Sequence, residues 1–195
     1  MIDYIIGAIT KIYPTFVVVE TGGIGYFANI SLNTFSKLEK QKECKLFVHE
    51  IIREDSHTLY GFADEQERDL YRLLISVNGV GPSTANVMLS SLSVDEIKMA
   101  ISESNVNVLK GIKGIGLKTA QRIVVDLKDK VDKQGLSGEL FGFADNTNRD
   151  EALSALVMLG FNKSAVTKVL DNIIKKENGL SVEELIKRSL KNLQH

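Results

Sequence analysis

The chain has 195 residues, a formal net charge of −1, 44% hydrophobic residues and 25% charged residues, values that exclude wholesale disorder. A single cysteine, Cys44, excludes an internal disulfide framework. No apolar run approaches the roughly 20 residues needed to cross a bilayer, and the first residues lack a signal-peptide pattern. We therefore expect a cytoplasmic protein, not a membrane protein, built as one large domain or as two or three small ones.

Residues 1–63 have the composition of a β domain, rich in Ile, Val and aromatic residues. Strands are expected at residues 4–13, 15–21, 24–31, 44–53 and 57–62. Gly22 and Gly23 are typical of a hairpin loop, and the polar stretch 33–43 is a longer connection. Five short strands with one long connection predict a closed barrel of the OB type, although an SH3-like barrel fits the same pattern.

The turn between the fourth and fifth strands carries two adjacent acids, Glu54 and Asp55. Acids at a hairpin tip are most often solvated turn residues. The functional alternative is an electrostatic pin, in which the two carboxylates repel phosphates and so shape how DNA enters. Sequence periodicity alone does not choose between these two interpretations.

Residues 64–131 are expected to be helical. Asp64 and Glu67 stand at capping-box spacing before an apolar pattern of helical period, and Ser93 and Glu96 repeat that spacing. The expected helices follow Asp64, begin at Pro82, follow Ser93, run from Asn105 to Gly111, and run from Leu117 to about Lys130. Four to five short helices in one segment of this length predict one helical domain.

One phrase occurs twice in this helical segment, as NGVGPSTA at 78–85 and as KGIGLKTA at 113–120, with a constant offset of 35 residues. The offset pairs Gly79 with Gly114, and Gly81 with Gly116. Two glycines around one aliphatic residue indicate a tight turn in which glycine adopts positive φ. The second glycine then begins a helix, whose unpaired N–H groups and positive dipole end suit a phosphate. One such turn is usually a plain connector, but two in register indicate helix-hairpin-helix units that hold a nucleic-acid backbone.

The two copies differ in charge. The second carries Lys118, Thr119 and Arg122, which can add charge-assisted contacts to phosphate. The first has Ser83 and Thr84 where the second has Lys118 and Thr119, so we expect it to bind phosphate more weakly, through backbone N–H groups and hydroxyls. Plain solvation of a helix surface is the alternative interpretation of the two cations. A net charge of −1 is unusual for a DNA-binding protein, so any attraction for phosphate must be local.

Residues 111–119 nearly form a Walker A loop, the phosphate-binding loop of many nucleotide hydrolases. The lysine, however, stands one residue too far from the second glycine, and the preceding segment is predicted to be a short helix where a strand is required. We therefore do not expect this chain to hydrolyse nucleotides.

Residues 132–148 contain three glycines and many polar residues, which predicts a flexible linker. Residues 149–195 then predict a three-helix bundle, with helices at about 149–159 and 162–176 and a third after Ser181, where Glu184 completes a capping box. Its expected core residues are Leu153, Leu156, Leu159, Phe161, Val166, Val169, Leu170, Ile173, Leu185 and Leu190. So small a bundle on a tether suits a protein partner, although it could equally be a stabilising appendage.

The sequence shows no catalytic constellation. His49, His57 and His195 are scattered without metal-ligand spacing, and the carboxylates do not form the dense set that two-metal nucleases require. We therefore expect a binding scaffold without a metal.

Three stretches are, taken together, characteristic of one protein family: REDSHTLYGF at 53–62, NGVGPSTA at 78–85 and GIGLKTAQRIVVDLKDK at 114–130. With the order of barrel, tandem hairpins, linker and helical tail, they resemble the RuvA family of bacterial Holliday-junction branch-migration subunits over the whole length. The resemblance implies an α+β multidomain fold, with an OB-type barrel at 1–63, a tandem helix-hairpin-helix domain at 64–131, a linker at 132–148 and a three-helix bundle at 149–195.

The same resemblance implies a non-catalytic subunit that binds four-way junction DNA as a homotetramer, or as two tetramers, and holds the junction open and nearly square. Glu54 and Asp55 would be the acidic pin at the crossover. The residues expected to bind DNA are Gly79, Gly81, Ser83, Thr84, Gly114, Gly116, Lys118, Thr119 and Arg122. Ser83 and Thr84 depart from the more basic pair that the family pattern leads us to expect, which puts the strength of that contact in question.

The resemblance further implies that residues 149–195 bind the RuvB motor ATPase, and that the RuvC resolvase joins a larger complex. The motor would use ATP and magnesium, whereas this chain would need no cofactor. The residues expected to contact the partner are Leu156, Leu159, Val169, Leu170 and Ile173.

Two other classes of function stay open. A helix-hairpin-helix glycosylase or nuclease would need a catalytic aspartate in a base pocket; Asp126 and Asp129 are available but are predicted to lie on the surface of one helix. A scaffold that binds proteins only is the second. An incision assay on damaged duplex tests the first class, and a gel shift with four-way junction against duplex separates all three.

Overall fold

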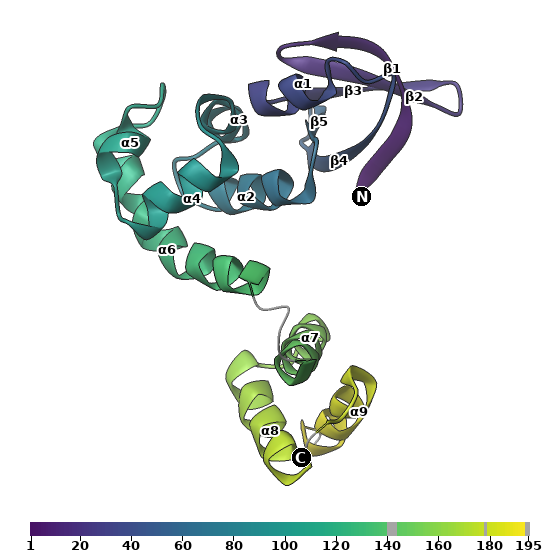
Figure 1. Cartoon of the computed structure of the whole chain (residues 1–195), viewed down its shortest axis with the longest axis vertical. Coiled ribbons are helices and arrows are strands. Elements are labelled where there is room, and N and C mark those ends of the chain that lie inside the picture. Colours follow the sequence, from purple (N-terminus) through teal and green to yellow (C-terminus); the bar gives the residue numbers. More distant parts are fainter. Residues whose placement is uncertain (140–143, 178, 194–195) are drawn as a thin grey trace. The chain divides into compact units, whose positions relative to one another are not determined.

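The computed structural model describes residues 1–139, 144–177 and 179–193 (Figure 1). The chain divides into two units, Met1–Gln134 and Gly135–His195, which are called here the N-terminal and the C-terminal unit. The N-terminal unit contains the barrel and most of the helices, and the C-terminal unit is helical.

Five strands of the N-terminal unit close into a barrel in the order β1-β2-β3-β5-β4. They are β1 (Tyr4–Tyr13), β2 (Phe16–Thr21), β3 (Ile24–Ile30), β4 (Glu43–Ile52) and β5 (His57–Phe62). The pairs are antiparallel except for β3 with β5, and β1 closes the barrel because it pairs with both β2 and β4. The register of β1 against β2 shifts between Ile9 and Lys11, an irregularity typical of a strand that bends around a barrel. The predicted barrel is confirmed.

The connection between β3 and β4 contains a short helix, α1 (Leu32–Leu38), where we expected only a polar stretch. Ser31 caps this helix, since its hydroxyl accepts the N–H of Thr34 at 2.9 Å. Thr34 and Leu38 are buried. A helix this short is marginal alone and forms here through tertiary contacts, which leave little periodic signal in the sequence.

Five helices follow the barrel: α2 (Glu65–Ile75), α3 (Pro82–Ser91), α4 (Val94–Ser102), α5 (Val106–Lys110) and α6 (Leu117–Glu139). Their apolar faces share one hydrophobic core with Tyr60 and Phe62 of β5. Tyr71 of α2 is fully buried, and its ring centroid lies 4.9 Å from that of Phe62 and 5.2 Å from that of Tyr60. The helices therefore pack on β5 through this core, whereas the interior of the barrel has a separate hydrophobic cluster that includes Val17, Leu46 and Val48.

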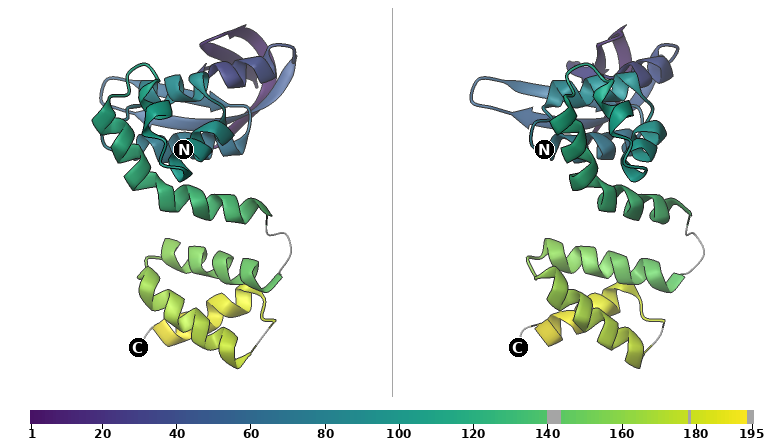
Figure 2. Two further views of the ribbon diagram at one scale, coloured as in Figure 1. Left: turned by 60° about the vertical axis from the view of Figure 1, so that its left-hand side comes forward. Right: turned by 90° about the vertical axis from the view of Figure 1, so that its left-hand side faces the viewer.

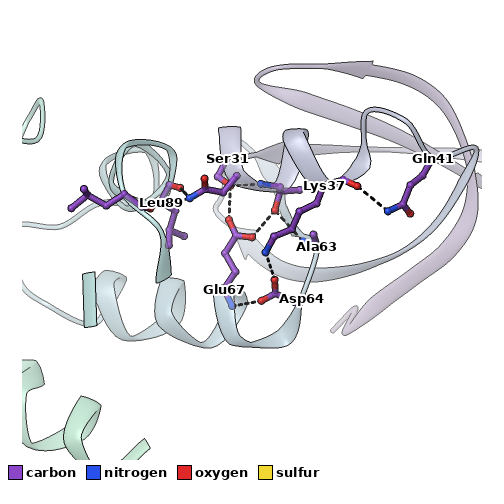
Figure 3. Close-up of polar contacts among 10 residues, drawn as sticks. Ser31, Lys37, Gln41, Ala63, Asp64, Glu67 and Leu89 are labelled. Carbon is purple, nitrogen blue, oxygen red and sulfur yellow. Dashed lines mark hydrogen bonds and ion pairs between the residues drawn. The ribbon is translucent and has the colours of Figure 1, made fainter. Parts of the chain in front are cut away.

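Polar contacts also fix the helices to the barrel, as Figure 3 shows. Glu67 of α2 is only 1% exposed, and its carboxylate accepts hydrogen bonds from the hydroxyls of Ser31 and Thr34, the latter at 2.7 Å. Burial raises the pKa of Glu67, against the opposing effect of the two hydroxyl donors. Asn33 of α1 donates to the carbonyls of Leu89 and Leu92, at 2.6 and 2.9 Å. The first hairpin leads directly into α3, so these bonds hold it relative to the barrel.

The predicted linker differs from the structure. Helix α6 continues to Glu139 and α7 begins at Ala144, so 132–139 and 144–148 of the predicted flexible linker are helical. The predicted linker residues 140–143 lie outside the described part of the chain. A glycine inside a helix costs only about 1 kcal/mol relative to alanine, and extending an existing helix is far easier than nucleating one. Val131, 3% exposed, still belongs to the core, so α6 is anchored in the core up to this residue.

The C-terminal unit has the three predicted helices: α7 (Ala144–Met158), α8 (Lys163–Lys176) and α9 (Val182–Leu193). The capping box predicted before the last helix is confirmed, with Ser181 N to Glu184 Oε2 at 3.0 Å and Glu184 N to Ser181 Oγ at 3.3 Å. The buried residues of its core are Ala152, Leu156, Val166, Leu170 and Leu185. Leu159 is 62% exposed, so its assignment to the core was wrong. In the described parts of the chain, no helix is both long and apolar enough to cross a membrane.

Candidate nucleic-acid interface

The two glycine turns have the same backbone geometry. Gly79 has φ +96° and Gly114 has φ +93°, in the left-handed region that glycine adopts without strain. In each turn the following aliphatic residue, Val80 or Ile115, donates its N–H to the carbonyl three positions earlier at 3.0 Å and is 5% exposed. The sequence repeat is thus a structural repeat, with the aliphatic residue anchoring each turn in the core.

The second glycine of each pair begins a helix, as predicted. Gly81 has φ −85°, which any residue adopts, and Gly116 is not among the residues with positive φ. A Cβ added to Gly81 or Gly116 would have no heavy atom within 4 Å. Neither turn geometry nor internal packing requires these two glycines, so the positive φ expected in each turn belongs to the first glycine alone. Their lack of a side chain leaves the start of each helix open to close approach by a ligand backbone.

Each turn leads into a helix whose first N–H groups are available. The hydrogen-bond ladders of α3 and α6 begin with Ala85 N to Gly81 O and Ala120 N to Gly116 O, both at 2.9 Å. The N–H groups before these two have no partner within their own helix. Gly81 caps α3 without any side-chain hydrogen bond. Two helix N-termini with positive dipole ends are therefore presented by one domain.

The two turns lie against one another. A Cβ built on Gly79 would lie 3.8 Å from Thr119 Oγ1, and one on Gly114 would lie 4.0 Å from Thr84 Cγ2. Each turn thus faces the first turn of the other hairpin's helix, which relates the two hairpins by a pseudo-two-fold axis. Thr84 and Thr119 therefore lie at the contact between the hairpins.

The charged side chains are placed unequally around these turns. Lys118 and Arg122 are exposed. Arg122 of α6 reaches the first turn, where its Nη1 donates to the carbonyl oxygen of Asn78 at 3.2 Å. Sequence reasoning missed Asn78, and no sequence signal could have found it, because the acceptor is a main-chain oxygen 44 positions away. It also missed Leu117, which is apolar yet 56% exposed at the start of α6.

Glu54 and Asp55 lie on a separate element, the tip of the β4–β5 hairpin. The strand pairing ends at Ile52 with His57, and Arg53 N donates to Ser56 O at 2.8 Å to close the turn. Both acids are exposed. Figure 2 (right view) shows this hairpin, in blue, extending away from the helices of the N-terminal unit. The two carboxylates are therefore presented at the end of a β ribbon, as a pin would require.

The base of this ribbon is held by Glu50. Its carboxylate accepts the N–H of Ile2 at 3.0 Å and lies 2.7 Å from His57 Nε2. The Ile2 N–H is the main cause that lowers the pKa of Glu50, with His57 adding to it. Glu50 therefore stays ionised and ties the first residues of the chain to the ribbon that carries the pin.

The geometry gives no support to a catalytic aspartate. Asp126 and Asp129 are exposed on α6, so neither lies in a base pocket. Among the residues that the structure describes, no three His, Cys, Asp or Glu side chains gather as a metal site would need.

In the C-terminal unit, two of the five residues expected to contact a partner do not reach the surface. Leu156 and Leu170 are 0% exposed and form the core of the bundle, so their assignment to a partner surface was wrong. Leu159 is exposed beside Met158, which is 88% exposed. The remaining two, Val169 and Ile173, line a groove of about 760 Å³ together with Asn172, Glu177, Arg188, Lys191 and Asn192.

Comparison with known proteins agrees with this architecture. Residues 1–61 match the family model of the RuvA N terminal domain, residues 71–129 a SAM-like helix-hairpin-helix tandem, and residues 147–194 the RuvA C-terminal domain. Relatives include proteins of Christiangramia forsetii, 49% identical, and Bacteroides thetaiotaomicron, 47% identical, each covering 99% of this chain and 100% of the relative. A protein of Flavobacterium psychrophilum is 46% identical with the same coverage. All three carry the name Holliday junction branch migration complex subunit RuvA. This chain belongs to the RuvA family.

Proposed function

We propose that this chain is the non-catalytic DNA-binding subunit of a branch-migration complex, which recognises four-way junctions and works with a RuvB motor. Its full-length similarity to proteins named as RuvA subunits supports the choice of substrate. The observation that carries the proposal is the pair of adjacent helix N-termini, each opened by a glycine at which a Cβ would meet no atom within 4 Å.

The hairpins hold the DNA backbone. Phosphate oxygens accept hydrogen bonds from the first N–H groups of α3 and α6, and Lys118 adds an exposed cation at the second hairpin. Contacts to phosphates position a protein on DNA without reading bases, so this mode of binding has no sequence preference. Its affinity falls as the salt concentration rises.

The acidic pin acts on the centre of the junction. Glu54 and Asp55, exposed at the end of the β4–β5 ribbon, repel phosphates and keep strands from closing over the crossover. Four copies around one crossover require a homotetramer, and a second tetramer on the opposite face would enclose the DNA. RuvC joins the same junction in a larger complex.

The C-terminal unit recruits the motor. Of the residues first expected to contact it, Leu159, Val169 and Ile173 have surface available, whereas Leu156 and Leu170 stabilise the bundle. ATP and magnesium serve the motor, this chain needs no cofactor of its own, and the complex acts in the cytoplasm.

A competition gel shift tests this proposal. Labelled four-way junction is bound by the full chain and challenged with unlabelled duplex of the same sequences or with unlabelled junction. We expect the junction to compete far better than the duplex. Equal competition would contradict junction recognition, and no shift at all would favour a scaffold that binds proteins only.

A truncation tests the division of labour. The chain should be cut after Glu139, at the end of α6, because a cut after Lys130 would remove the buried Val131 from the core. We expect the truncated chain to bind junctions as the full chain does and to lose motor-driven branch migration. Migration at the full rate would mean that the C-terminal unit is not the docking site.

A further inference from the structure

The first hairpin has no cation of its own. The sequence holds no Lys or Arg between Arg72 and Lys98, a stretch that includes the whole first hairpin and all of α3. The second hairpin, in contrast, has Lys113, Lys118 and Arg122 around its turn. If each hairpin kept its own charges, one of two structurally equivalent phosphate sites would lack any charge-assisted contact.

The fold places one of these cations of the second hairpin beside the first hairpin. Thr119, in the first turn of α6, faces Gly79 of the first hairpin, since a Cβ on that glycine would lie 3.8 Å from Thr119 Oγ1. Arg122 follows three residues later and so lies on the same face of the helix. Its Nη1 donates to Asn78 O at 3.2 Å, directly before the left-handed Gly79. Two positions of α6, one turn apart, thus face the first hairpin.

The pseudo-two-fold relation is broken at this point. The residue of α3 that corresponds to Arg122 is Val87, and the residue of the second turn that corresponds to Asn78 is Lys113. No guanidinium can therefore extend from α3 toward the second turn. The second turn has its own lysines, whereas the first depends on the opposite helix.

We propose that Arg122 is the phosphate-binding cation of the first hairpin, supplied by the helix of the second hairpin. This inference rests on the proposed function, in which the hairpins bind DNA phosphates. A guanidinium has five N–H donors in a planar fork, so one bond to the Asn78 carbonyl leaves capacity for a phosphate oxygen. The bond to that carbonyl also orders a long side chain before DNA binds, which lowers the entropy lost on binding. The position of the first hairpin's cation therefore depends on the helix of the second hairpin.

The test maps individual phosphates. A synthetic four-way junction is made with single methylphosphonates, each of which removes one phosphate charge, and the loss of affinity of the full chain is measured at each position. Ser83→Glu and Lys118→Glu place a negative charge at equivalent positions of the two hairpins. A phosphate is assigned to the first hairpin if its neutralisation no longer lowers the affinity of Ser83→Glu. It is assigned to the second hairpin if its neutralisation no longer lowers the affinity of Lys118→Glu.

Arg122→Gln then decides the role of the guanidinium, because glutamine keeps an N–H donor for the Asn78 carbonyl but carries no charge. We expect this variant to bind the junction roughly tenfold more weakly, as for the loss of one charge-assisted hydrogen bond. The methylphosphonate effects of the first-hairpin set should shrink, because only the N–H groups of α3 still bind these phosphates, and those of the second-hairpin set should remain. Arg122→Lys should restore part of the first-hairpin effects, since the charge returns without the fork.

Lys128→Ala is the matched control. Lys128 is a cation of the same helix that donates to Ser104 Oγ at 3.0 Å, so its removal changes the net charge equally. It should leave both sets unchanged. If the first-hairpin methylphosphonates still lower the affinity of Arg122→Gln as they do for wild type, Arg122 only stabilises the turn. If only the second-hairpin effects are lost, Arg122 binds a phosphate of its own hairpin. Either result overturns the inference. Failure of the wild-type chain to bind the junction would overturn the proposed function and the inference with it.

Discussion

Gly79 faces Thr119 across the contact between the two hairpins: a Cβ on the glycine would lie 3.8 Å from the threonine Oγ1. The equivalent pair, Gly114 and Thr84, makes the reciprocal contact at 4.0 Å. The glycine turn of each hairpin is therefore supported by the helix that the other turn begins. These reciprocal contacts bring two helix N-termini together, and they allow a side chain of one hairpin to reach the turn of the other.

The two glycines of each turn should respond oppositely to alanine. Gly79→Ala and Gly114→Ala force a side chain into positive φ, which costs about 1–2 kcal/mol of stability. Gly81→Ala and Gly116→Ala should leave stability nearly unchanged, because the new methyl group meets no atom of the protein within 4 Å. They should instead weaken junction binding by roughly tenfold, since the methyl group occupies the space of the DNA backbone. Urea unfolding and gel shifts of the four variants check this; a stability loss in Gly116→Ala equal to that in Gly114→Ala would contradict it.

Charge reversal should reveal the inequality of the hairpins. Lys118→Glu removes an exposed cation and should make the fall of log affinity with log salt less steep, by about one unit of slope per bound protomer. Ser83→Glu, at the equivalent position, removes no cation from its own site, so its effect on affinity should come from repulsion alone. Titrations of junction at several salt concentrations measure both slopes. An unchanged slope in Lys118→Glu would show that this lysine does not contact phosphate.

Neutralising the pin should change selectivity more than affinity. The double variant Glu54→Ala/Asp55→Ala removes two exposed carboxylates from the hairpin tip without touching the core. We expect junction binding to be kept and discrimination against plain duplex to fall. Glu20→Gln/Glu39→Gln removes the same charge from other exposed positions of the barrel and should keep the discrimination. Competition gel shifts compare the variants, and the pin hypothesis fails if both double variants select the junction as the wild type does.

Glu67 should make stability depend on pH. Burial raises its folded-state pKa above the ordinary value of 4.5, so the fold favours the protonated carboxyl. The stabilising contribution is fully present below the ordinary pKa and is lost as pH rises through the folded-state pKa. Glu67→Gln is neutral throughout and escapes this loss. The free energy of unfolding of the variant, relative to wild type, should therefore rise as pH increases above the ordinary pKa of 4.5 in urea titrations. Parallel curves would contradict the raised pKa.

Two leucines three positions apart should separate folding of the C-terminal unit from partner binding. Leu156→Ala removes a fully buried side chain and should destabilise this unit by about 2–5 kcal/mol. Leu159→Ser changes a side chain that is 62% exposed, so stability should change little while binding to RuvB weakens roughly tenfold or more. Thermal unfolding and a RuvB pull-down distinguish the two effects. Full RuvB binding by a folded Leu159→Ser variant would move the docking surface elsewhere, for example to the groove that contains Val169.

The sequence by itself determined the features that depend on neighbours in the chain. A positive-φ turn at Gly79 and Gly114 and the capping boxes at Ser93 and Ser181 are local, because backbone conformation and capping act over a few residues. The constant offset of 35 residues between the two glycine turns is likewise a property of the sequence alone.

Only the tertiary structure decided which residues meet across the chain. The bond from Arg122 to the Asn78 carbonyl spans 44 positions, and no pattern of residue types indicates a main-chain acceptor. Periodicity placed Leu156 and Leu159 alike on an apolar face, yet one is buried and the other exposed, because exposure depends on where α8 and α9 pack. Helix α1 was also not predicted, since tertiary contacts outweigh its weak local propensity. The continuation of α6 was not predicted either, because extending an existing helix is easier than nucleating one. Local chemistry thus set the two glycine turns, and packing decided which side chains surround them.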